Sequence, residues 1–210
     1  MVAAAPSELR GNKQHGLRFR MSLRRHLQIV TSDGQPVEDT CFHRTHGLRR
    51  TDELGLDLAE ELFLRLFRGL CVGLFCENDD GVSKVHDFIV GELGDEPGTL
   101  LLSNTVDLIY AIRATRRSDF SFMPAECPIC SRHISNEECA TLMLVRAARA
   151  GDNVALMEQA SVLTEGHIMI GVGLAAKVLG EQLDDLSAAG QIPGLRAASR
   201  SNDAGPFTCS

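Results

Sequence analysis

The sequence predicts an α+β fold, with a small mixed N-terminal region followed by a zinc knuckle and a helical C-terminal region. Apolar residues recur at helical spacing in residues 58–67 and again after residue 136. Short apolar runs bounded by turn residues lie between these two segments. A C-x2-C pair, Cys127 and Cys130, separates the mixed part from the helical part.

The chain has 210 residues and 44% hydrophobic content, which is enough for one good core with a small appended module. Residues 1–22 are basic and lack an apolar period, so we expect a disordered leader, and Met21 is as plausible a start as Met1. The predicted divisions are a leader at 1–22, an α+β domain at 23–118, a zinc-knuckle and helical region at 119–190, and a flexible tail at 191–210.

Charge and hydropathy exclude several classes of protein. No apolar run approaches the roughly 20 residues that span a bilayer, and the N-terminus lacks the apolar core of a signal peptide. The seven cysteines therefore read as thiols or metal ligands in a cytoplasmic protein. A net charge of −7 repels phosphate backbones, so nucleic acid is not an expected partner.

The N-terminal half is expected to combine strands with helices. Short apolar runs predict strands at 27–31, 85–90 and 99–103, the last two joined by the turn-rich segment 91–98. A capped amphipathic pattern with arginines near its end predicts a helix over 104–118.

The strongest helical period of this half precedes those runs. Gly55 weakens a first turn, so the helix is expected to begin nearer Asp57 and to continue through Phe67. The apolar segment 69–76 is either the buried end of that helix or a short buried strand, since periodicity alone does not separate the two.

The C-terminal half is expected to be helical. Ser135 with Glu138 three residues later is a capping-box pattern, which predicts a helix over 136–150. Two further helices are predicted at 153–163 and 174–190.

The Cys127–Cys130 pair predicts a structural zinc site. Two residues between the thiolates let one tight turn aim both sulfurs at a single ion. Tetrahedral zinc needs two more ligands, and His133 and Cys139 are the nearest candidates. A redox C-x2-C and an iron–sulfur cluster remain alternatives, although the residues before Cys127 make a poor strand and the other cysteines are distant in sequence.

A second group of ligand-type residues comprises Cys41, His43 and His46. With an open fourth position these side chains could hold a metal that activates water, and His43 could also join the knuckle. Their Arg-rich surroundings favour a plain solvent-facing stretch instead.

Gly171, Gly173 and Ala176 form a G-x-G-x-x-A pattern, which resembles a dinucleotide-binding fingerprint in outline. The pattern lies too near the C-terminus to complete a βαβ unit, so small residues that allow close helix packing are the favoured interpretation.

Together these features predict a small soluble zinc-stabilised protein that acts through protein–protein contacts, as a regulator or adaptor. Its C-terminal helices would supply an apolar face for self-association or a protein partner. The alternative is a metal-dependent enzyme that uses Cys41, His43 and His46, and no sequence motif identifies a substrate.

Overall fold

The computed structural model describes residues 21–23, 47–75, 80–125, 127–167 and 169–192, and these residues are mostly helical. The helices are α1 (Leu58–Phe75), α2 (Gly81–Leu93), α3 (Asp95–Thr115), α4 (Asn136–Arg149), α5 (Asn153–Leu163) and α6 (Ile170–Ala188). The remaining elements are short: β1 (Met21–Leu23), β2 (Arg49–Arg50), β3 (Phe120–Phe122), β4 (His133–Ile134) and the 3-10 turns η1 (Thr51–Leu54) and η2 (Cys130–Arg132).

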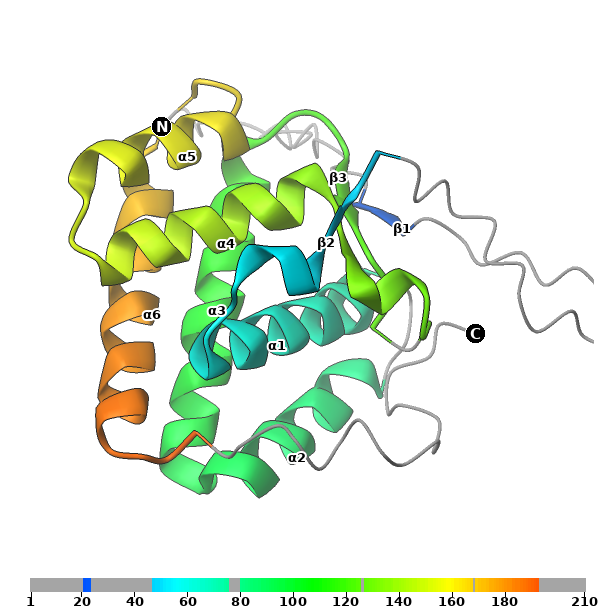
Figure 1. The fold of residues 1–210 in the computed structure, drawn as a ribbon, viewed down its shortest axis with the longest axis vertical. Coiled ribbons are helices and arrows are strands. Elements are labelled where there is room, and N and C mark those ends of the chain that lie inside the picture. The colour runs from blue at the N-terminus through cyan, green and yellow to red at the C-terminus, as the bar shows by residue number, and fades with distance from the viewer. Residues whose placement is uncertain (1–20, 24–46, 76–79, 126, 168, 193–210) are drawn as a thin grey trace, which may run out of the picture.

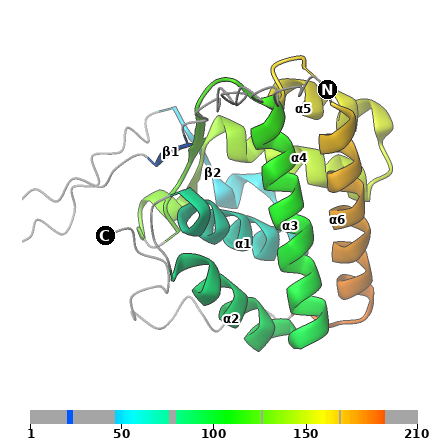
Figure 2. The same ribbon diagram turned by 180° about the vertical axis from the view of Figure 1, so that it is seen from behind.

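The helices pack in a crossed arrangement. α3 and α6 run side by side in opposite directions, and Figure 2 shows them as the two long helices of the rear face. α4 packs against both α5 and α6 and lies across the start of α1 (Figure 1). α2 follows α1 and packs on both α1 and α3. Among the described residues, no helix is long and apolar enough to cross a membrane.

The α+β prediction is correct only in part, because both strands expected between the two helical segments are wrong. Residues 85–90 lie inside α2, and residues 99–103 lie inside α3. Val85 and Ile89 are fully buried one helical turn apart, so the run buries a helix face. A short apolar run fits a buried helix as well as a strand, and here tertiary packing decides.

The other helix predictions are confirmed, with shifts at their ends. α1 continues to Phe75, so segment 69–76 is the buried end of this helix as far as the structure describes it. Gly55 adopts a left-handed conformation with φ of 56° and ends η1 before α1 begins. Asp57 and Glu60 then cap α1 reciprocally, each backbone N–H donating to the other's carboxylate at 3.1 and 2.8 Å.

Two very small sheets join the segments around the C-x2-C turn. β1 pairs in parallel with β3, placing Met21 opposite Phe120, and β2 pairs antiparallel with β4. β1 begins at Met21, so it overlaps the last two residues of the leader expected at 1–22. The predicted strand at 27–31 lies outside the described residues.

One hydrophobic core draws on both sides of the predicted boundary at residue 118. Phe63 and Phe67 of α1 lie 5.7 Å apart between ring centroids, and Phe67 lies 5.8 Å from Phe120 of β3. Leu142 of α4 and Leu179 of α6 are fully buried in the same cluster. The mixed and helical parts are therefore packed together, and tilted aromatic pairs contribute to that packing.

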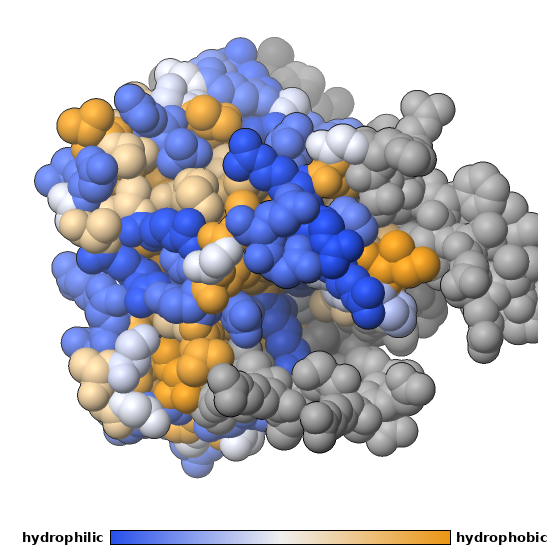
Figure 3. Space-filling view, viewed as in Figure 1, coloured by the Kyte–Doolittle hydropathy of each residue, from blue (hydrophilic) through white to orange (hydrophobic). Residues whose placement is uncertain are grey.

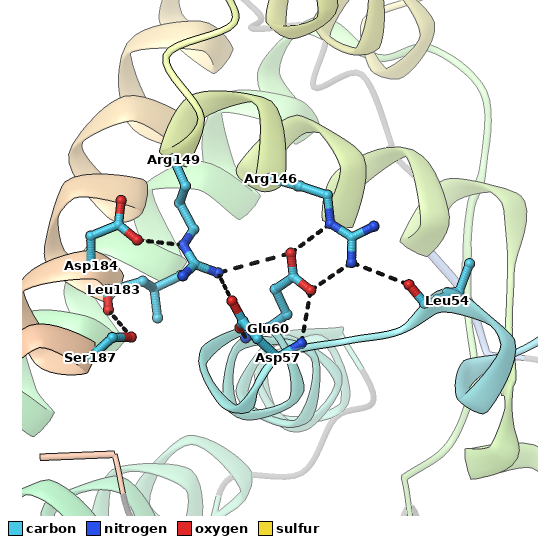
Figure 4. A network of polar contacts seen from close by, with 8 residues as sticks. All are labelled: Leu54, Asp57, Glu60, Arg146, Arg149, Leu183, Asp184 and Ser187. Carbon is cyan, nitrogen blue, oxygen red and sulfur yellow. Dashed lines mark hydrogen bonds and ion pairs between the residues drawn. The ribbon is translucent and has the colours of Figure 1, made fainter. Parts of the chain in front are cut away.

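A polar network joins α1, α4 and α6 at the edge of this core (Figure 4). Arg146 donates to both carboxylate oxygens of Glu60, at 2.7 and 2.6 Å. Arg149 donates to Asp57 and to Asp184, each at 2.7 Å. Figure 3 shows a hydrophilic area where α4 meets the start of α1. Bidentate arginine–carboxylate contacts fix geometry as well as adding energy.

The pKa of Asp57 responds to opposed influences in this network. Partial burial acts to raise it, but the N–H of Glu60 and the guanidinium of Arg149 outweigh burial, so the pKa lies below its usual value. The folded state therefore favours the charged form of this carboxyl.

Candidate functional site

Cys127 and Cys130 lie together on one tight turn, as the sequence predicts. The backbone N–H of Cys130 donates to the sulfur of Cys127 at 3.3 Å. The N–H of Ser131 donates to the carbonyl oxygen of Cys127 at 2.8 Å, so the turn is helical in character and continues into η2. In a metal site, such an N–H would soften the charge of the bound thiolate.

The two thiols belong to an apolar cluster of their own. Cys127 is 9% exposed and Cys130 is fully buried. Met123 shares this cluster, and Leu48 packs against it. The turn is thus set apart from the main core, in which the other described cysteines, Cys71 and Cys139, take part.

Arg68 of α1 holds the loop that carries the second thiol. Its guanidinium donates to the carbonyl oxygens of Ser131 and His133, at 2.9 and 2.6 Å. It also forms two hydrogen bonds with Glu138 of α4, at 2.7 and 3.1 Å. Arg68 is 4% exposed, so these contacts replace the water that a buried cation requires.

Glu138 holds the same loop from the other side. Its carboxylate accepts the backbone N–H groups of Met123 and Ser135, at 3.0 and 2.9 Å. Its own N–H donates to the hydroxyl of Ser135 at 3.0 Å, which completes the predicted capping box. The sequence therefore identifies Glu138 as a cap, but not as the partner of Arg68. The sequence signal for that role is weak, because Arg68 is one of two arginines, with Arg65, in the mainly apolar stretch 62–75.

The four predicted zinc ligands do not form one site in the structure. Across the described ranges, no group of three or more His, Cys, Asp or Glu side chains could hold a metal ion. Cys139 lines a different cavity, with Met143 of α4, and packs against the main core. The Nδ1 of His133 lies 2.9 Å from the carbonyl oxygen of Ile129. Cys139 fails to meet the turn because the first turn of α4 directs it toward α5, where Val162 lines the same cavity.

The geometry of the Cys127–Cys130 turn bears on whether the two thiols are a redox pair or a structural pair. A redox pair requires an accessible attacking thiol at the start of a helix. Here both thiols are buried, and the turn leads into a three-residue 3-10 segment. Burial and the N–H···S contact favour a structural role for the pair. Cys41, His43 and His46 lie outside the described residues, so the second predicted metal group stays a prediction.

The G-x-G-x-x-A pattern lies within the first turns of α6, where Gly173 and Ala176 are buried and Gly171 is exposed. No strand of the described structure leads into this helix, so the context of a dinucleotide site is not present there. α6 lies close to the end of α4 one turn further on, at Gly180. A Cβ at this position would lie 3.2 Å from the side chains of Ala148 and Arg149.

No protein-family model, no curated protein and no solved structure matches this chain.

Proposed function

We propose that this chain is a small zinc-stabilised protein that acts through protein–protein contacts, as a regulator or adaptor. The observation that carries the proposal is the buried Cys127–Cys130 turn, in which an N–H is directed at one sulfur. Two thiolates on one turn are the usual half of a structural zinc site. Zinc would tie this turn to further ligands and so add metal-binding energy to the folding energy.

The loop around the turn is built to be held in one conformation. Arg68 and Glu138 together fix backbone groups at Met123, Ser131, His133 and Ser135. Such a frame limits the motion of the two thiols and lowers the cost of ordering them around an ion. Cys139 lines a cavity with Met143, away from this turn, so Cys127 and Cys130 are the two ligands that the proposal assigns.

The proposed contact surface lies on α6. Ile170, Leu174 and Val178 recur every fourth residue and are 69%, 60% and 51% exposed. Side chains spaced by four residues form one ridge of a helix, and ridges of this kind pack into the grooves of another helix. We name Ile170, Leu174 and Val178 the α6 ridge. Its regular spacing supports self-association through paired copies of α6.

Zinc content tests the first half of the proposal. Native mass spectrometry of the purified chain should show about one zinc per chain. Cys127→Ser should remove the metal, whereas Cys139→Ser, a matched change at a thiol in another cavity, should retain it. A metal-free chain that is fully folded would refute a structural zinc.

Sedimentation velocity tests the second half. The wild-type chain should shift toward a dimer as its concentration rises, and Leu174→Glu should abolish that shift, because a buried unpaired charge is costly at a helix interface. Ser103→Glu, at an exposed polar position of α3, is the matched control and should leave the shift unchanged. A wild-type chain that stays monomeric at all concentrations would refute self-association through the α6 ridge.

A further inference from the structure

A cavity of about 350 Å³ opens beside the Cys127–Cys130 loop, between that loop, the η1 segment and one face of α1. Its apolar wall includes Leu56, Leu64 and Ala125. Arg65 and Arg68, one turn apart on α1, also line it. We name this space the arginine cavity. Its volume lies at the small end of the range found for pockets that bind small molecules.

Arg65 is a half-buried cation. Its guanidinium carbon lies 4.2 Å from the ring centroid of Phe88, which covers one face of the group. In the part of the chain that the structure describes, Arg65 forms no hydrogen bond and no ion pair. Burial lowers its pKa, and Glu92 opposes that effect only in part. The site would therefore gain stability from an anion placed in the cavity.

Arg68 offers a second donor. Arg68 forms four hydrogen bonds. They use the N–H of Nε, one N–H of Nη1 and both N–H groups of Nη2. A guanidinium carries five N–H donors. The remaining N–H of Nη1 has no acceptor within the described ranges, although the side chain is only 4% exposed. Glu138 neutralises the charge of Arg68, so this arginine supplies a hydrogen bond and Arg65 supplies the charge.

The acidic residues of the cavity lie nearer to solvent. Asp52 is exposed and forms an ion pair with Arg50 at 2.6 Å. Glu61 is also exposed, one turn before Arg65. A cationic interior with acidic groups at the mouth favours a small anion over a polyanion such as nucleic acid, because the mouth repels extended negative charge.

We infer that the arginine cavity binds a small organic oxyanion, whose charged oxygens meet Arg65 and Arg68 and whose apolar part lies against Leu56, Leu64 and Ala125. This site goes beyond the proposed function and needs neither zinc nor a partner. A carboxylate and a phosphate monoester share the required chemistry, and the two arginines present the donors that both groups accept.

Isothermal titration calorimetry on the full chain tests this inference, with butyrate and inorganic phosphate as probes. We expect saturable binding of at least one probe, which Arg65→Gln weakens by about tenfold or more, as the loss of a charge-assisted hydrogen bond predicts. Arg65→Lys should retain part of the binding, because it keeps the charge. Tighter binding of butyrate would identify a carboxylate ligand, and tighter binding of phosphate a phosphorylated one.

Arg113→Gln is the matched control, because Arg113 also lies over an aromatic ring, at 5.1 Å from the centroid of Phe75, but does not line the arginine cavity. It should bind the probes as the wild type does. The inference fails if neither probe gives saturable heat, if Arg65→Gln binds as tightly as the wild type, or if ethylammonium competes with the anions. Far-ultraviolet circular dichroism of each variant establishes that the fold is retained.

Discussion

Arg68 of α1 and Glu138 of α4 form a buried ion pair, 2.7 Å between Nε and Oε1, in which the two side chains are 4% and 0% exposed. Seventy residues separate them in the sequence. Together they fix the loop of the C-x2-C turn at both ends. A buried pair of this kind need not add net stability over apolar residues of the same size, but the loss of one partner is costly.

Glu138→Ala should therefore be among the most damaging single changes in this chain. It leaves the Arg68 cation buried without a counter-charge, and it removes the acceptor for two backbone N–H groups. We expect a loss of about 3–5 kcal/mol in the free energy of unfolding, measured by urea denaturation. Glu137→Ala is the matched control. It removes only a 3.4 Å contact with Arg116, so it should cost about 1 kcal/mol or less. An equal loss in the free energy of unfolding for both variants would contradict the role of Arg68 and Glu138 in fixing the loop.

Cys127→Ser should loosen the turn before it affects the rest of the molecule. If the thiol holds a metal, hydrogen exchange of peptides covering residues 127–135 should accelerate, while α1 stays protected by its contacts with the core. Peptide mass spectrometry makes the comparison. Cys139→Ser should leave exchange of residues 127–135 unchanged, since Cys139 packs elsewhere. Unchanged protection in the Cys127→Ser variant would mean that this thiol has no structural role.

The depressed pKa of Asp57 gives a pH-dependent contribution to stability. A carboxyl whose folded pKa lies below its unfolded value stabilises the fold above the unfolded pKa, about 4, and loses that contribution as the pH falls through the folded pKa. Asp57→Asn keeps an oxygen that can cap α1 but removes the charge. At pH 7 the wild type should be more stable by about 1 kcal/mol or less, because Asp57 is half exposed. The gap should narrow in urea titrations as the pH falls below about 4, the unfolded pKa of an aspartate. A gap that stays constant down to pH 2 would exclude this charge effect.

The sequence predicts those parts of the fold that local chemistry decides. Ser135 and Glu138 identify the start of α4 because a capping box is a local pattern. Cys127 and Cys130 are correctly placed together because two intervening residues leave little freedom. The predicted strand at 85–90 is wrong because the burial of this segment depends on the packing of α1 and α3 against α2. The local sequence does not contain that information.

Long-range features of the site lie beyond such patterns. No local signal pairs Arg68 with Glu138, because the contact depends on how α1 crosses the loop before α4. The position of Cys139 also depends on such a feature. Nearness in sequence predicts a site shared with the turn, whereas in the structure Cys139 lines a cavity with Met143 of α4 and Val162 of α5.

α2 and α3 approach each other closely at Gly98. A Cβ added there would meet the carbonyl oxygen of Ile89 at 2.9 Å and the Cα of Val90 at 3.0 Å, and both are backbone atoms that cannot rotate away. Gly98→Ala should therefore destabilise the chain by about 1–3 kcal/mol, even though alanine is the better helix former. Gly91→Ala is the matched control on the exposed side of α2. No atom lies within 4 Å of the added Cβ, so this variant should be as stable as the wild type or up to about 1 kcal/mol more stable. Thermal and urea unfolding of the two variants make the comparison. If Gly98→Ala proves as stable as Gly91→Ala, close packing of α2 against α3 at Gly98 does not limit the side chain at this position.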